Sequence, residues 1–110
     1  MARLLLVEDD AELLELQSLI LRRAGHEVLS TQSAEAALKC FQARRPDVVI
    51  MDYRIPRPED GAGLIRDLGP GVRVIVLSGA SLKDTVEGAA RVLRKPCSPR
   101  VLLQAIAELA

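Results

Sequence analysis

Short apolar runs alternate along the chain with segments whose apolar residues recur every three or four positions. The runs are typical of buried strands, and the segments between them are typical of helices that cover a sheet. The predicted strands are residues 3–7, 26–30, 48–51, 72–77 and 90–93. The predicted helices are residues 10–24, 33–44, 64–68, 81–86 and 98–109, and residues 54–63 are predicted to form a loop.

Residues with known preferences for helix ends support these boundaries. Asp9 and Glu12 resemble a capping arrangement at the start of the first helix, and Gly25 is a suitable stop at its end. Ser98 followed by Pro99 is a typical start for the last helix. Residues 26–30 are more polar than the other predicted strands, so we expect this strand near an edge of the sheet.

The strand-helix alternation occurs five times, which predicts a parallel sheet with helices on both faces. Right-handed crossovers leave few possible arrangements, and the common one for five strands is the flavodoxin-like, doubly wound order 2-1-3-4-5. A chain of 110 residues is long enough for one core. We therefore expect residues 1–110 to form a single domain of the α/β class.

Composition narrows the classes of protein that the chain can belong to. Hydrophobic residues make up 49% and charged residues 27%, as in globular proteins. Fifteen basic and fifteen acidic residues cancel, which gives no electrostatic case for direct binding to nucleic acid or to a membrane. The start of the chain shows no secretory pattern. Together with two cysteines that lack metal-ligand spacing, this predicts a cytoplasmic protein with reduced thiols.

The predicted topology brings polar residues from four strands to one edge of the sheet. Strands 1 and 3 are neighbours in the order 2-1-3-4-5, so Glu8 and Asp9 should lie beside Asp52. Ser78 ends the fourth strand, and Lys95 follows the fifth. Three carboxylates, a hydroxyl and an ammonium group are therefore expected to form one site.

The chemistry of this site follows from its charges. Three close carboxylates repel one another, and a Mg²⁺ ion with its preference for oxygen ligands would relieve the repulsion. A phosphoryl group could then bind, with Lys95 as a further positive partner and Ser78 as a hydrogen-bond donor. Asp52 is the carboxylate best placed to attack phosphorus, which would give an aspartyl phosphate.

The chain carries four characteristic segments in this order: Leu5–Asp10, Asp47–Pro56, Val74–Gly79 and Arg94–Pro96. Together they resemble the receiver domain of response regulators, which takes a phosphoryl group from a histidine kinase in two-component signalling. The resemblance covers residues 3–109 and implies that Asp52 is the phosphoacceptor, with Glu8 and Asp9 as the acidic pair. It also implies that the main-chain carbonyl of Arg54 faces the metal, that Ser78 and Lys95 are switch residues, and that the Lys95–Pro96 bond is cis.

The chain departs from the family pattern at three places. Asp52 and Gly61 are nine positions apart, about one more than usual, which predicts a longer loop. Ser78 and Lys95 are seventeen positions apart, about five fewer than usual, so the fourth helix should be shortened or displaced. Val92 stands where many relatives carry an aromatic residue that moves on phosphorylation, which weakens the case for the usual coupling.

Three functions fit the sequence. In the first, phosphorylation of Asp52 by a histidine kinase or a phosphotransfer protein switches contacts with a downstream target, an output domain or a second copy. Such a domain is no enzyme beyond its own phosphorylation and dephosphorylation. The second is a pseudo-receiver that binds a protein without phosphorylation. The third is an enzyme, but Glu8–Asp10 replace the glycines of a nucleotide site, and Arg54 replaces the second acid of an aspartyl phosphatase.

Overall fold

A computed structural model of the protein describes residues 1–79 and 86–110, in which five strands and four helices form one α/β unit. Within the described ranges, no helix is long and apolar enough to span a bilayer. The strands are β1 (Arg3–Val7), β2 (Glu27–Thr31), β3 (Val48–Asp52), β4 (Val74–Ser78) and β5 (Arg91–Arg94). The helices are α1 (Ala11–Arg23), α2 (Ala34–Arg44), α3 (Pro58–Leu68) and α4 (Pro99–Leu109).

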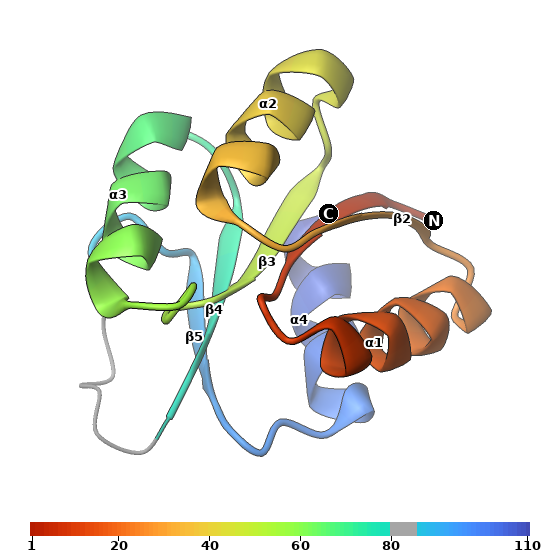
Figure 1. The fold of residues 1–110 in the computed structure, drawn as a ribbon. Coiled ribbons are helices and arrows are strands. Elements are labelled where there is room, and N and C mark those ends of the chain that lie inside the picture. Colours follow the sequence, from red (N-terminus) through yellow and green to blue (C-terminus); the bar gives the residue numbers. More distant parts are fainter. Residues whose placement is uncertain (80–85) are drawn as a thin grey trace.

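The five strands form a parallel sheet in the order β2-β1-β3-β4-β5, as predicted, with β2 at one edge (Figure 1). Asp52 at the end of β3 pairs with Leu77 of β4, and Ser78 pairs with Arg94 of β5. Because the strands are parallel and nearly in step, their C-terminal ends share one rim. That rim carries the residues that the sequence singled out.

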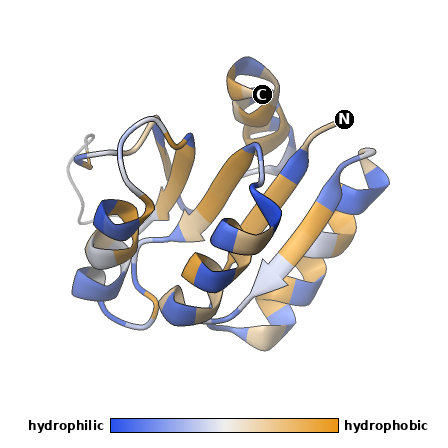
Figure 2. Ribbon diagram, turned by 90° about the horizontal axis from the view of Figure 1, so that it is seen from above, coloured by the Kyte–Doolittle hydropathy of each residue, from blue (hydrophilic) through white to orange (hydrophobic). Residues whose placement is uncertain are grey.

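Helices cover both faces of the sheet, with α1 and α4 on one side and α2 and α3 on the other (Figure 1). Successive residues of β3 serve alternate layers: Val48 and Ile50 pack toward α1 and α4, whereas Val49 and Met51 pack toward α2 and α3. All four side chains are fully buried. The strands form an apolar layer between helices whose outer faces are polar (Figure 2). Burial on both faces explains why β3 is a continuous apolar run.

Side chains cap three of the helices. Asp10 is the N-cap of α1, where its Oδ1 accepts hydrogen bonds from the amides of Glu12 and Leu13. The sequence had suggested Asp9 with Glu12, and the shift of the cap by one residue leaves Asp9 outside the helix. Ser33 and Ser98 cap α2 and α4, and the expected start of the last helix is confirmed.

The predicted loop over residues 54–63 is wrong in its second half, because α3 already begins at Pro58. Asp60 Oδ2 accepts hydrogen bonds from the backbone amide and the Nε of Arg57, and these contacts close the first turn. Gly61 and Gly63, read as loop residues, lie inside the helix. Arg57 is a poor N-cap residue by type, but Pro58 at the first helical position and the acids Glu59 and Asp60 after it are signals for a helix start. The two glycines had outweighed these signals.

The predicted fourth helix at residues 81–86 lies outside the described residues, except for Val86. In the described part of this connection, Gly79 and residues 86–90 adopt no helical structure. β5 begins at Arg91, and Val92 on it is half-buried against the layer that holds α2 and α3.

Candidate functional site

The four strand ends that were predicted to meet do lie together at the C-terminal rim. Glu8 directly follows β1, and Asp52 closes β3 beside it. Ser78 closes β4, and Lys95 follows β5 on the far side. The amide of Lys95 donates a 2.8 Å hydrogen bond to the carbonyl of Ser78, which ties the two segments together beyond the last strand pair.

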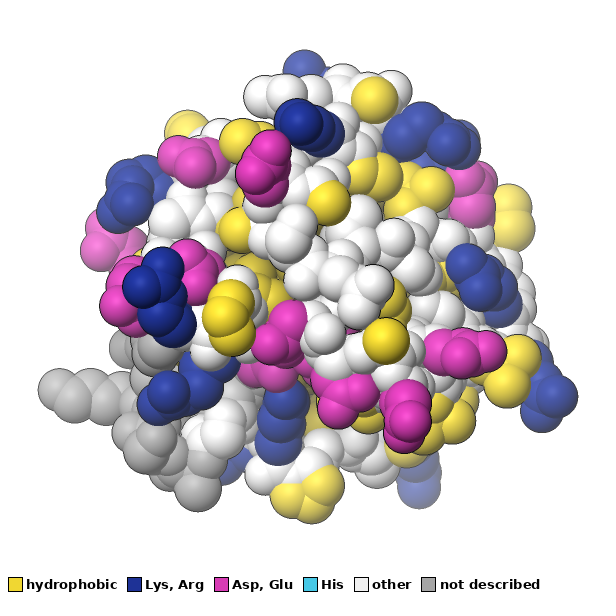
Figure 3. Space-filling model, in the orientation of Figure 1, with side chains coloured by type: hydrophobic (Ala, Val, Ile, Leu, Met, Phe, Trp, Pro, Cys, Tyr) yellow, Lys and Arg dark blue, Asp and Glu magenta, His cyan; other side chains and the backbone are white. Residues whose placement is uncertain are grey.

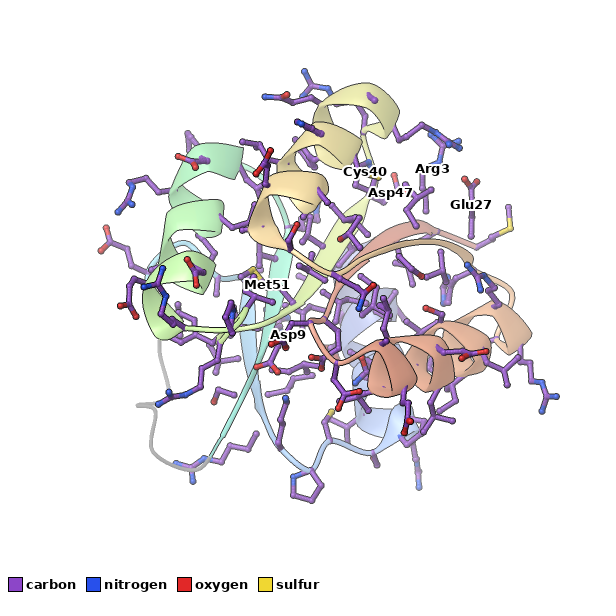
Figure 4. All side chains as sticks on the ribbon, viewed as in Figure 1. Arg3, Asp9, Glu27, Cys40, Asp47 and Met51 are labelled. Atoms are coloured by element: carbon purple, nitrogen blue, oxygen red, sulfur yellow. The ribbon has the colours of Figure 1, made fainter. Side chains whose placement is uncertain are left out.

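Three acidic side chains form the centre of the site. Carboxylate oxygens of Glu8, Asp9 and Asp52 all lie within 4.8 Å of one another. Asp9 lies beside the end of β3, at the opposite end of the sheet from Arg3 and Glu27 (Figure 4). Acidic side chains gather near the middle of this face of the molecule, with basic side chains close by (Figure 3). The cluster is graded in burial: Glu8 is buried, Asp52 is partly buried and Asp9 is exposed.

Glu8 is the most perturbed of the three acids. It is only 3% exposed, and this burial raises the pKa of its carboxyl from 4.5 to about 7. Hydrogen bonding with the Asp9 side chain and the charge of Asp52 also raise the pKa. The amide of Asp10, 3.2 Å from Oε2, and the charge of Lys95 lower it. Near neutral pH, Glu8 therefore holds a proton about half of the time, and a bound cation would displace that proton.

Lys95 supplies the positive charge nearest to the acids. Its Nζ donates to Oδ2 of Asp52 at 2.5 Å, and the two side chains are 33% and 15% exposed. An ion pair at this depth is screened less than one at the surface. The Lys95–Pro96 peptide bond is cis, which confirms the prediction, and the Ile55–Pro56 bond is cis as well.

Ser78 and Arg54 contribute to the site in different ways. The Ser78 side chain is 2% exposed, and its hydroxyl donates to the carbonyl of Gly79 at 3.2 Å rather than to Asp52. The amide of Arg54 donates to Oδ1 of Asp52 at 3.4 Å, while the Arg54 side chain is exposed. Asp52 thus accepts a hydrogen bond from Lys95 on Oδ2 and a hydrogen bond from the main-chain amide of Arg54 on Oδ1.

Some contacts at the site were not found from the sequence. The amides of Asp10 and Arg54 give no sequence signal, because every residue except proline carries such a group. The side chain of Gln32 donates to the carbonyl of Asp9 at 3.4 Å. Gln32 follows the end of β2, so the argument that located the other four strand ends could have found it too.

The donor set fits a hard divalent cation. Mg²⁺ prefers oxygen ligands and is usually bound through one or two carboxylates together with phosphate oxygens. Glu8, Asp9 and Asp52 offer three carboxylates from two adjacent strand ends, with no sulfur or nitrogen ligand among them. The residues present therefore suit Mg²⁺ better than a softer metal such as Zn²⁺.

Comparison with known protein sequences places nearly all of the chain in one family. A family model described as the response regulator receiver domain matches residues 4–107. The response regulator protein FleR of Pseudomonas aeruginosa is 36% identical over 113 residues, which cover 96% of this chain and 24% of FleR. The DNA-binding response regulator MtrA of Mycobacterium tuberculosis is 31% identical, over 92% of this chain and 47% of MtrA. The chain thus spans about a quarter of FleR and about half of MtrA.

Solved structures agree with the sequence matches. A response regulator receiver domain protein from Clostridium thermocellum superposes with a TM-score of 0.90 at 30% identity, over 99% of this chain and 94% of that one. A receiver domain protein from Methanospirillum hungatei gives a TM-score of 0.83 at 28% identity, over 98% and 92% of the two chains. TM-scores of 0.90 and 0.83 over nearly the whole chain show that these proteins have the same fold.

Proposed function

Because this chain belongs to the response regulator receiver domain family, we propose that it is a signalling switch in which Asp52 accepts a phosphoryl group in the presence of Mg²⁺. The observation that carries the proposal is that charged side chains from three other positions converge on Asp52. Two further carboxylates lie within 4.8 Å of it, and the Lys95 ammonium is paired with it. An ordinary turn-forming aspartate at a strand end would not require these partners.

The proposed reaction transfers a phosphoryl group to the Asp52 carboxylate. A carboxylate oxygen of Asp52 attacks phosphorus, the bond from phosphorus to the donor breaks, and the leaving group departs with the electron pair. Glu8 and Asp9, with the main-chain carbonyl of Arg54, would hold Mg²⁺. When bound, Mg²⁺ supplies positive charge that offsets repulsion between the incoming phosphoryl oxygens and the carboxylates.

Lys95 and Ser78 are proposed to hold the phosphoryl group once it is attached. The Lys95 ammonium already reaches Asp52, so it needs only to transfer its hydrogen bond from the carboxylate to a phosphoryl oxygen. The Ser78 hydroxyl donates to Gly79 and would have to rotate toward the site. This rotation would release the hydrogen bond to Gly79, and we propose it as the first step of the switch. The chain then acts on its own Asp52 rather than on a separate substrate.

The proposed phosphodonor is a histidine kinase or a phosphotransfer protein. Leu16 on α1 is 55% exposed and lies one helical turn from both Leu13 and Ile20. Leu13 and Ile20 line an apolar pocket of about 450 Å³ that is also lined by Lys95 and Pro96. An exposed apolar surface next to the site suits a protein donor that must bring its phosphoryl group to Asp52.

A substitution on this surface separates the protein donor from a small one. Leu16→Asp should slow phosphoryl transfer from the partner kinase at least tenfold but leave labelling by acetyl phosphate unchanged, since acetyl phosphate needs no docking surface. Glu12→Gln on the same helix is the control. Equal losses with both donors would show that the surface matters for the fold or the site rather than for docking.

The proposed output is a change in protein contacts, made with an output domain, a separate target or a second copy of the chain. MtrA is named as DNA-binding, and this chain corresponds to less than half of it. The sequence carries fifteen basic and fifteen acidic residues, with no excess of basic charge. We therefore propose that any contact with DNA is made outside these 110 residues.

We propose a cytoplasmic location for the protein. The free thiols of Cys40 and Cys97 agree with this location.

The experiment that tests the function is Mg²⁺-dependent labelling by acetyl phosphate, followed by intact mass. The wild-type protein should gain one phosphoryl group with Mg²⁺ and none after chelation. Asp52→Asn should gain none, whereas Asp67→Asn, an exposed acid on α3, should behave like the wild type. Equal labelling of the Asp52→Asn protein would refute the assignment. The pseudo-receiver alternative predicts no labelling at all, and the intact set of Glu8, Asp9, Asp52 and Lys95 gives it no support.

A further inference from the structure

The peptide group between Tyr53 and Arg54 joins the proposed phosphoacceptor to helix α3. Its N–H, which belongs to Arg54, donates to Oδ1 of Asp52 at 3.4 Å. Its carbonyl oxygen, which belongs to Tyr53, lies against the backbone of Gly61 in the first turns of α3. The N–H and the carbonyl of a trans peptide point in opposite directions within one rigid plane. A shift of the oxygen at Gly61 must therefore move the donor at Asp52.

The approach at Gly61 is too close for any other residue. A Cβ placed on Gly61 would lie 2.0 Å from the Tyr53 oxygen, 2.9 Å from its carbonyl carbon and 3.1 Å from its Cα. Cβ atoms in proteins essentially never approach another heavy atom to less than 3.0 Å, so alanine requires a movement of at least about 1 Å. The three crowded atoms are all main-chain atoms, so no side-chain rotation can relieve the contact.

Helix α3 is poorly able to move away. Leu64 and Ile65 on it are 2% and 7% exposed and pack into the core. A methyl carbon of Ile65 lies so close to Gly88 that a Cβ there would come within 2.5 Å of it. The Tyr53–Arg54 peptide lies between β3 and α3, outside both elements, so we expect it to be the part that shifts.

We infer that Gly61 is a positioning residue for Asp52: its missing side chain lets the Tyr53–Arg54 peptide lie where it donates to the carboxylate. The inference deepens the proposed function and rests on it for its kinetic readout. It also gives the glycine in α3 a reason to be present, since a glycine inside a helix is otherwise unfavourable.

Gly63 provides a matched control in the same helix. A Cβ on Gly63 would lie 3.6 Å from Nη2 of Arg66, which is an ordinary contact with a flexible side chain. Gly61→Ala and Gly63→Ala make the same chemical change in one helix and gain the same helix propensity. Only Gly61→Ala meets the Tyr53 carbonyl.

The test measures acetyl phosphate labelling at saturating Mg²⁺, with the amide resonance of Arg54 as a second readout. Gly61→Ala should lower the labelling rate at least tenfold and shift the Arg54 resonance, because a displacement of about 1 Å can cost about a hundredfold in rate. Gly63→Ala should stay within about twofold of the wild type. A purely structural role would change the unfolding midpoint but neither readout.

The outcomes separate this inference from the proposed function. A Gly61→Ala protein that folds, is labelled within twofold of the wild-type rate and keeps the Arg54 resonance would overturn the inference. If Gly61→Ala does not fold, the double variant with Gly63→Ala carries the same measurements, and failure of that variant to fold would also overturn it. If the wild type takes no phosphoryl group, the proposed function fails, and the Arg54 resonance alone decides the role of Gly61.

Discussion

A change of pH from 6 to 8 is expected to raise the affinity of the protein for Mg²⁺ about tenfold. The reason is Glu8, whose pKa is raised to about 7 mainly by burial. A carboxyl with this pKa is ionised in about one tenth of molecules at pH 6 and in about nine tenths at pH 8. Binding of Mg²⁺ requires the ionised form, so the proton must leave first. The affinity therefore follows the ionised fraction.

Isothermal titration calorimetry with Mg²⁺ at pH 6, 7 and 8 measures this dependence. Titrations in two buffers of different ionisation enthalpy count the released protons, with about half a proton expected at pH 7. Glu8→Gln removes the titrating group, so its affinity should be lower than that of the wild type at pH 8 and nearly constant with pH. An unchanged wild-type affinity from pH 6 to 8, or a tenfold rise that persists in Glu8→Gln, would refute the reasoning.

Three further predictions concern charge and packing. In metal-free protein, the raised pKa of Glu8 means that unfolding releases its proton at pH values between 4.5 and 7. The urea concentration at the unfolding midpoint should therefore fall as the pH rises over this range. A midpoint that rises with pH in the wild type but not in Glu8→Gln would contradict this. Lys95→Met removes the ammonium paired with Asp52 and should slow acetyl phosphate labelling at least tenfold, while Lys39→Met on the exposed face of α2 should have no effect. Ile50→Ala leaves a cavity in a fully buried site and should cost about 3–4 kcal/mol in chemical denaturation; a loss below about 1 kcal/mol would show that the core is loosely packed.

The strand order and the shared rim were predictable because β1, β3 and β4 are compact apolar runs and β2 is more polar, as suits an edge. A strand such as β3, buried on both faces, leaves no ambiguity about which residues are inside, and Asp52 is conspicuous at its end. Parallel topology then brings Glu8 to it across more than forty positions of sequence. These inferences need only periodicity and the handedness of crossovers.

The start of α3 was missed because Gly61 and Gly63 have the composition of a loop. Pro58 at the first helical position and the acids Glu59 and Asp60 were the available signals for a helix start. The reason for Gly61 lies in the Tyr53 carbonyl, eight positions away, and only the folded arrangement brings the two together. The raised pKa of Glu8 depends in the same way on burial that its position in the sequence does not reveal.

The central claim is that Asp52 is the residue that takes the phosphoryl group. It is tested most directly by treating the protein with acetyl phosphate and Mg²⁺, reducing any acyl phosphate with borohydride and locating the modified residue by peptide mass spectrometry. The account predicts homoserine at position 52 and unmodified peptides around Glu8 and Asp9. Reduction at another acid, or none in a protein shown to bind Mg²⁺, would contradict it.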